Sequence, residues 1–337
     1  MKFSVGYQLR SDDIIVEAIK ENEPKIGEIY FSWEDLPNGR NTLSEVTMNR
    51  YEARKKQELD FKAISQSKVA FNLLLNGNCY GKYAQSRAFF YKIGDTVEYL
   101  LSICNLKSVT TTSLLIAKFI KQNFPDIDVR ASVNMGIENT VGMDYIAEYF
   151  DSFYLKREYN RNFDKLMQAR RWCDQNGKKL YGLANSGCLN FCSAHTFHDN
   201  LVSHEQEISE MDNSYAFEGQ CFVYLKSRQN RENWFKLTNF IRPEDVALYD
   251  GYFDGLKIAT RMNSNPRRVI NAYCKGSFFG AISDLLEPNH SGLFYPQVVE
   301  NKKIPIDFAK TVLHCNKDCD KCNYCVESLK KCLTALE

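Results

Sequence analysis

Eight short apolar segments recur along the chain, and their lengths and spacing limit the folds that it can adopt. Each has the length of a β-strand, and together they cover residues 2–9, 26–33, 68–76, 107–112, 128–133, 152–156, 179–185 and 255–260. Between most of them lie segments whose apolar residues recur every three or four positions, which predict helices over 113–124, 142–150 and 162–177. Alternating strands and helices with parallel crossovers are typical of an α/β fold.

Eight strand–helix units favour a closed (β/α)8 TIM-type barrel over an open doubly wound sheet. The first strand–helix connection also lacks the G-x-G-x-x-G pattern of a dinucleotide-binding sheet. We assign the barrel to residues 1–298, with insertions at 34–67 and 186–254, and the first insertion is expected to start a helix at the capping-box pattern Thr42 to Glu45. Residues 299–337 are expected to form a linker and a cysteine-rich tail that binds a metal or a cluster. Insertions that follow barrel strands lie on the carboxyl-terminal face, where this fold builds its active sites.

The composition is that of an ordinary globular protein, with 44% hydrophobic residues, 25% charged residues and a net charge of +1. This composition argues against a disordered chain and against a protein that coats nucleic acid. The N-terminus "MKFSVGYQLRSDD" has no signal-peptide core, and no run of 18 apolar residues occurs, so we expect a cytoplasmic protein without membrane association. Twelve cysteines in a reducing compartment are expected to ligate metal rather than to form disulfides.

Four of the cysteines stand close together near the C-terminus, in the order Cys315-x3-Cys319-x2-Cys322-x2-Cys325. Such short gaps let the chain curl round one metal centre with every sulfur pointing inward. Because zinc sites usually pair two hairpins across a longer loop, this compressed run favours a [4Fe-4S] cluster, with zinc as the alternative. We treat it as a closed site for electron transfer or structural support.

A second group of cysteines is expected at the barrel mouth. Cys188 and Cys192 directly follow the strand predicted at 179–185, and Cys221 can return to the same place from the insertion. Cys79 is the candidate for a fourth ligand, because the strand predicted at 68–76 also ends at the mouth. The four would hold a second [4Fe-4S] cluster on the catalytic face.

Histidine and arginine side chains are candidates for further roles at the same face. His195 and His198 follow Cys192 closely enough for a mixed zinc site with Cys188 and Cys192, or they could transfer protons beside a redox centre. Arg157 and Arg261 are expected at strand ends, where a guanidinium can hold a carboxylate or phosphate with two hydrogen bonds.

Three segments of the chain have a recognisable combination of residues: "NGNCYG", "DVRASVNMGIENTVGMDYIAEYFDSFYLKREYNRNFDKL" and "GLANSGCLNFC". Together they resemble the U32 peptidase family, also called collagenase-like peptidases, and the resemblance extends over roughly residues 68–290. It implies a barrel-type fold and, as in the iron–sulfur members, a [4Fe-4S] cluster with ligands at Cys188, Cys192 and Cys221. Those members act in oxygen-independent hydroxylation, either in ubiquinone biosynthesis or on transfer or ribosomal RNA bases.

The leading hypothesis is therefore an iron–sulfur barrel enzyme that carries out oxygen-independent oxidative tailoring of a small molecule, peptide or RNA base, with an electron donor as partner. An alternative is a metal-dependent peptidase that uses His195, His198 or Glu205. The sequence shows no Ser/His/Asp or Cys/His arrangement at a diagnostic spacing and no H-E-x-x-H. A third hypothesis is a non-catalytic, cluster-bearing partner protein.

Overall fold

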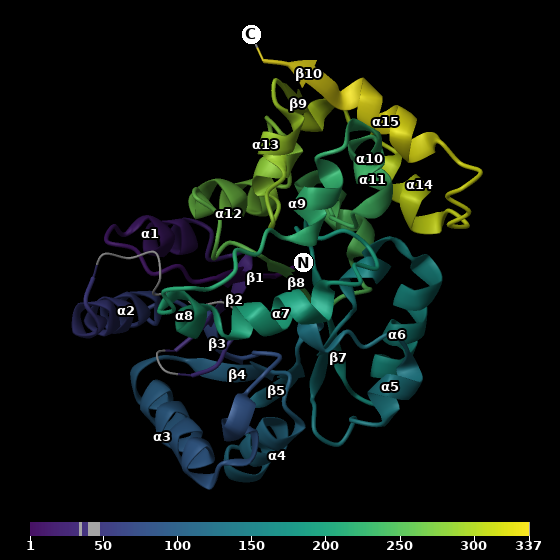
Figure 1. Cartoon of the computed structure of the whole chain (residues 1–337). Coiled ribbons are helices and arrows are strands. Elements are labelled where there is room, and N and C mark those ends of the chain that lie inside the picture. Colours follow the sequence, from purple (N-terminus) through teal and green to yellow (C-terminus); the bar gives the residue numbers. More distant parts are fainter. Residues whose placement is uncertain (34–35, 40–47, 337) are drawn as a thin grey trace.

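Eight parallel strands form a closed barrel in the computed structural model, which describes residues 1–33, 36–39 and 48–336 (Figure 1). Each strand pairs with the next along the chain, and β8 pairs with β1 to close the ring. The barrel strands are β1 (Phe3–Gly6), β2 (Ile26–Phe31), β3 (Ala70–Leu75), β4 (Leu106–Thr111), β5 (Asp128–Ala131), β6 (Ser152–Tyr154), β7 (Lys179–Leu183) and β8 (Gly255–Ile258). All eight coincide with the predicted segments, so the (β/α)8 prediction is confirmed.

Helices separate the strands and surround the ring. Those before β8 are α1 (Ile14–Glu21), α2 (Arg50–Ile64), α3 (Arg87–Ile103), α4 (Leu114–Asn123), α5 (Thr140–Asp144), α6 (Phe163–Gln175), α7 (His195–Ser203), α8 (Glu205–Ser209), α9 (Gln220–Leu225), α10 (Arg228–Arg231) and α11 (Trp234–Leu237). After β8 come α12 (Pro266–Lys275), α13 (Ser291–Phe294), α14 (Phe308–His314) and α15 (Tyr324–Cys332). Short 3-10 helices follow several strands, including η1 (Gly81–Gln85), η2 (Val133–Met135) and η3 (Arg157–Arg161).

Two helix boundaries differ from the sequence-based expectation. α2 begins at Arg50, where Asn49 and Glu52 form a capping box in which the Asn49 side chain accepts a hydrogen bond from the Glu52 N–H at 3.0 Å. The predicted start at Thr42 to Glu45 lies outside the described residues. The helix predicted over 142–150 ends at Asp144, because the following amides, such as that of Ile146, bond to the carbonyl three residues back rather than four.

The interior of the barrel is polar below its mouth, whereas branched apolar side chains usually fill this fold. Arg130 donates to Glu28 at 2.9 Å and to Asp128 at 2.8 Å, and its guanidinium lies 3.8 Å from the centre of the Tyr181 ring. Asn72 also donates to Glu28, at 2.9 Å. Each buried charge is thus paired and hydrogen-bonded, which is the condition under which charges are tolerated in an interior. The apolar core lies outside the ring, between the strands and their helices.

The C-terminal segment packs against the barrel rather than extending from it. β9 (Gln297–Val299) pairs antiparallel with β10 (Leu333–Ala335), so the boundary predicted at residue 299 falls within a strand. Phe308 contacts the Phe235 ring of α11 with a centroid distance of 5.0 Å and stacks on Tyr324 at 5.9 Å. Aromatic contacts therefore fix this segment on the insertion that follows β7.

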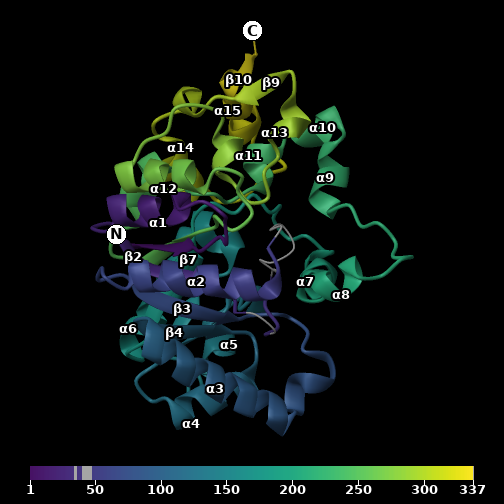
Figure 2. The same cartoon turned by 90° about the vertical axis from the view of Figure 1, so that its left-hand side faces the viewer.

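The insertion lies at one end of the barrel. In Figure 2 the N-terminus, at the start of β1, is on the opposite side of the molecule from α7 and α8. Because the strands are parallel, α7 and α8 lie at their carboxyl ends, where this fold places active sites. Within the described residues, no helix combines the length and the apolar character needed to cross a bilayer.

Candidate functional site

A cavity of about 300 Å³ opens at the carboxyl ends of the barrel strands. We call it the mouth cavity. Its lining includes all but one of the residues that the sequence predicts for the barrel-mouth site: Arg157, Cys188, Cys192, His195, His198, Cys221 and Arg261. Side chains from η3, from the segments that follow β7 and β8, and from α7 and α9 thus meet in one place, as expected for strand ends of a closed barrel.

Backbone packing fixes the position of Cys188. The Gly187 N–H donates to the carbonyl of Glu287 at 2.9 Å, and a Cβ at Gly187 would lie 2.2 Å from the carbonyl oxygen of Pro288. Only glycine allows this approach. Asn185, two residues before Gly187, donates to the carbonyl of Ala259 at 2.7 Å, which ties the ends of β7 and β8 together. Cys188 is therefore held by two neighbouring strand ends.

The three cysteines of the mouth cavity affect one another electrostatically. Burial raises the pKa of the Cys221 thiol to about 11, and the neighbouring thiols of Cys188 and Cys192 raise it further. Arg157, which is half-buried, donates to the Cys188 sulfur at 3.2 Å. The thiolate is the form of cysteine that ligates metals.

One face of α7 lines the mouth cavity. His195, His198, Asp199 and Val202 recur at helical spacing on this face. His195 Nε2 lies 3.4 Å from Asp199 Oδ2. Burial lowers the pKa of His195, and the positive charge of Arg157 lowers it further, so the ring is neutral at pH 7 and can accept a proton.

Lys257 is a feature of the mouth cavity that the sequence analysis missed. It lies in β8, is buried, and places its Nζ 4.0 Å from the centre of the Tyr30 ring. Burial and, to a smaller extent, the nearby charge of Arg261 lower its pKa to about 7, while Glu287 opposes this shift. A lysine among the apolar residues of a predicted barrel strand was the available signal.

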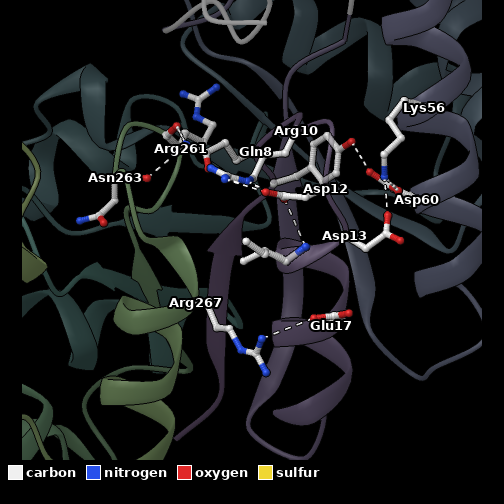
Figure 3. A network of polar contacts seen from close by, with 12 residues as sticks. Gln8, Arg10, Asp12, Asp13, Glu17, Lys56, Asp60, Arg261, Asn263 and Arg267 are labelled. Carbon is white, nitrogen blue, oxygen red and sulfur yellow. Dashed lines mark hydrogen bonds and ion pairs between the residues drawn. The ribbon is translucent and has the colours of Figure 1, made fainter.

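Arg261 is held at the cavity by its backbone. Gln8 donates through Nε2 to the Arg261 carbonyl at 2.8 Å, and Figure 3 shows the guanidinium pointing away from this contact. Gly6 makes room for the side chain, since a Cβ there would lie 2.8 Å from Arg261 Cγ. The side chain can therefore face the cavity while its backbone is fixed by β1.

Cys79 is not part of the mouth cavity. It lines a second cavity of about 430 Å³, together with His204, Glu205 and Glu207. β3, which precedes Cys79, and β7, which precedes Cys188, stand four strands apart in the eight-stranded ring. The structure therefore places Cys79 and Cys188 in different cavities, because β3 and β7 both end at the mouth but on opposite sides of the ring. Glu205 is likewise separated from His195 and His198.

The four C-terminal cysteines lie near one another. Cys315, Cys319 and Cys322 all contribute electrostatically to the raised pKa of Cys325, which burial raises most. Cys315 and Cys322 are exposed, and Lys236 donates to the carbonyl of Cys319 at 2.9 Å. The four thiols thus share one surface site beside α11.

The donor chemistry of both cysteine groups suits an iron–sulfur cluster, whose irons are held by thiolates. In the described ranges, no three or more His, Cys, Asp or Glu side chains converge closely enough to hold a single metal ion. A four-iron cluster is larger than an ion, and each of its thiolates binds a different iron. Three thiols on one cavity wall therefore fit its ligand chemistry without meeting at one point.

Comparison with known proteins agrees with this architecture. No protein-family model matches the chain. It is 28% identical over 275 residues to the uncharacterized protease MJ1657 of Methanocaldococcus jannaschii, covering 79% of this chain and 77% of that protein. The solved structure of the U32 peptidase Mk0906 superposes with a TM-score of 0.56 at 13% identity, covering 77% of this chain and 92% of that one. The similarity to Mk0906 is one of fold, and it agrees with the barrel-type fold that the resemblance in the sequence implies.

Proposed function

We propose that this U32 peptidase-like chain holds an iron–sulfur cluster at the mouth of its barrel and carries out oxygen-independent oxidative tailoring, of the hydroxylation type, on an anionic small molecule, peptide or RNA base. The observation that carries the proposal is that Cys188, Cys192 and Cys221 line one cavity although the last lies 29 residues beyond the second. Iron–sulfur clusters are held by cysteine thiolates in this way.

Charged side chains beside the cysteines would bind and orient the substrate. Arg157, Lys257 and Arg261 line the same cavity, opposed by Asp199 and Glu287. In a partly buried site, a guanidinium can hold a carboxylate or phosphate with two hydrogen bonds. This arrangement supports an anionic substrate whose reacting part lies toward the cysteines.

Two groups in the cavity can move protons near neutral pH. Burial brings the pKa of Lys257 to about 7, and the lowered pKa of His195 leaves its ring neutral. A general acid or base works best when its pKa is close to the working pH. When bound, the cluster would supply one-electron transfer or Lewis-acid chemistry. The C-terminal cysteines would hold a second cluster that exchanges electrons with an external redox partner.

The test measures iron, zinc and acid-labile sulfide per chain in anaerobically purified protein. The wild type is compared with two triple-Ser variants, one at Cys188, Cys192 and Cys221 and one at Cys315, Cys319 and Cys322. Substitution is preferable to truncation because Phe308 and Tyr324 pack on α11. We expect about eight irons in the wild type and about four in each variant, the count for two four-iron clusters. Zinc without sulfide would overturn the redox proposal.

A further inference from the structure

The second cavity, which we call the side cavity, is separate from the mouth cavity although α7 reaches both. It lies between the loop after β2, the loop after β3 and the start of α8. Three residues bring reactive groups to it: Cys79 from the β3 loop, and His204 and Glu207 from the α7–α8 junction. Cys79 and His204 are 125 positions apart in the chain. The proposed function uses none of these three side chains.

Cys79, His204 and Glu207 form a chain of hydrogen bonds. His204 Nδ1 lies 2.6 Å from Glu207 Oε2, and the same imidazole makes a hydrogen bond with the Cys79 thiol. Backbone contacts hold the two ends together, since the Asn78 N–H donates to the Ser203 hydroxyl at 2.8 Å. The residue before Cys79 is thus bonded to the residue before His204.

The charges of this group favour a thiolate beside an imidazolium. The hydrogen bond with His204 lowers the pKa of the Cys79 thiol, and a backbone N–H from Gly81 lowers it further. The same hydrogen bond raises the pKa of His204, and Glu207 raises it further. Nucleophilic cysteines are activated in this way by an adjacent histidine that a third group orients.

We propose that the side cavity is a second catalytic site, in which Cys79 is the nucleophile, His204 the general base and acid, and Glu207 the positioning residue for hydrolysis of an acyl compound. The Cys79 sulfur adds to the carbonyl carbon of an amide or ester. The bond to the leaving nitrogen or oxygen then breaks, and His204 gives that atom a proton. Water adds to the resulting thioester while His204 takes its proton, and the carboxylic acid leaves as the thiol is restored. One water is consumed, and no electron is gained or lost.

The walls of the side cavity indicate which acyl compounds it would accept. Trp33, Leu36, Tyr80, Tyr83 and Phe89 line it, so its surface beside Cys79 is aromatic and aliphatic. Such a wall binds an apolar group by removing it from water. We therefore infer that the substrate is an amide or ester whose acyl part carries an aromatic or aliphatic side chain.

The first experiment uses p-nitrophenyl phenylacetate, an ester with an aromatic acyl group, on the full-length protein. We expect a burst of p-nitrophenolate and, after acid quenching, a phenylacetyl adduct that peptide mass spectrometry maps to Cys79. Cys79→Ser should abolish the adduct, and His204→Asn should slow acylation by about 100-fold or more, the usual contribution of a general base. Cys274→Ser is the matched control, because this half-buried thiol lies on α12, outside both cavities. No adduct on Cys79 in the wild type, or an unchanged burst in Cys79→Ser, would overturn the proposal.

A second measurement does not depend on the choice of ester. Site-resolved alkylation by iodoacetamide at pH 6 should modify Cys79 of the wild type faster than Cys274, whose pKa burial raises to about 11. His204→Asn should remove this advantage, because the imidazole lowers the pKa of Cys79. Equal rates at the two cysteines in the wild type would contradict an activated thiol. Iron content does not enter either measurement, so failure of the cluster proposal leaves this one intact.

Discussion

His195 and His204 flank the same helix, yet their surroundings move their pKa values in opposite directions. Burial and the charge of Arg157 lower the pKa of His195 in the mouth cavity. Hydrogen bonds with Cys79 and Glu207 raise the pKa of His204 in the side cavity, where its side chain is 34% exposed. The comparison shows that the neighbours of a histidine, rather than the helix it stands on, set the direction in which its pKa moves.

The largest expected effect is that a single cysteine substitution changes the properties of one cavity and leaves those of the other unchanged. Cys188→Ala should remove the iron and sulfide of the mouth cavity and leave the alkylation rate of Cys79 unchanged. Cys79→Ala should leave the iron content unchanged, because β3 and β7 lie on opposite sides of the ring. Metal analysis and peptide mass spectrometry measure both outcomes. If Cys79→Ala lost as much iron as Cys188→Ala, Cys79 would be a cluster ligand and the two cavities one site.

The second prediction concerns the buried lysine that distinguishes the mouth cavity. In the folded protein the pKa of Lys257 is about 7, whereas the pKa of an exposed lysine is about 10.4. Between these two pKa values Lys257 is protonated in the unfolded chain but not in the folded protein. Its contribution therefore makes the free energy of unfolding rise with pH over this range. Below about pH 7 the lysine is protonated in both states, and the full cost of burying its charge is present. Lys257→Met should therefore raise the free energy of unfolding at pH 6 by a few kcal/mol, at about 1.4 kcal/mol per pKa unit.

The gain in the free energy of unfolding from Lys257→Met should shrink as the pH rises toward the pKa of an exposed lysine. Urea unfolding at several pH values measures it. Lys331→Met, at an exposed position of α15, is the control and should show no such pH dependence. If the variant were less stable than the wild type at every pH, the contribution of Lys257 to holding Arg261 and Glu287 in place would outweigh the free-energy cost of burying it.

The third prediction tests the backbone contact that places Cys188. A Cβ at Gly187 would lie 2.2 Å from the Pro288 carbonyl oxygen, so Gly187→Ala must displace one of the two segments. Overpacking of this kind costs about 1–3 kcal/mol of stability. Gly219→Ala, near Cys221, is the matched control, because its nearest contact is an ordinary 3.5 Å. Urea midpoints compare the two variants, and the side cavity should keep its thiol reactivity in both. Equal midpoints would show that the Pro288 segment yields without cost.

The sequence predicted the strands of this fold because each combines strand length with an apolar run bounded by a helical pattern. It also predicted which end of the barrel carries Arg157, Cys188 and Arg261, since strand ends alone determine that. It could not predict the position of Cys79 around the ring, because the rule for strand ends does not say which ends face each other. The strand-end rule therefore groups Cys79 with Cys188, whereas the structure places Cys79 in the side cavity.

Two features of the sites depend on contacts that no local pattern shows. Lys257 lies within an apolar strand, and only the closed ring reveals that it faces a buried cavity beside Arg261. Cys79 and His204 are 125 positions apart, so a Cys/His motif of short sequence spacing cannot reveal that they are neighbours. Catalytic cysteines and histidines are adjacent in the fold rather than in the chain.

The smallest expected effect separates the role of Glu207 from that of His204. Within the proposal, the raised pKa of His204 sets the alkaline limit of the imidazolium that accompanies the Cys79 thiolate. Glu207→Gln removes the carboxylate that helps to raise the pKa of His204, so the imidazolium should be lost at lower pH and the alkaline limit of the ion pair should move down. Because Glu207 is 74% exposed, solvent screens its charge and we expect a shift of less than one pH unit.

The pH dependence of the His204 ring resonances, followed by NMR, measures that shift directly, and iodoacetamide rates at Cys79 follow the thiolate. His195 provides an internal control in the same spectra, since Arg157 and Asp199 surround it and Glu207 does not contribute to its shift. A downward shift at His204 alone would establish Glu207 as a positioning residue of the side cavity. Unchanged titration of His204 would show that the 2.6 Å contact with Glu207 has no influence on the thiol. The catalytic pair would then be Cys79 and His204 without a third member.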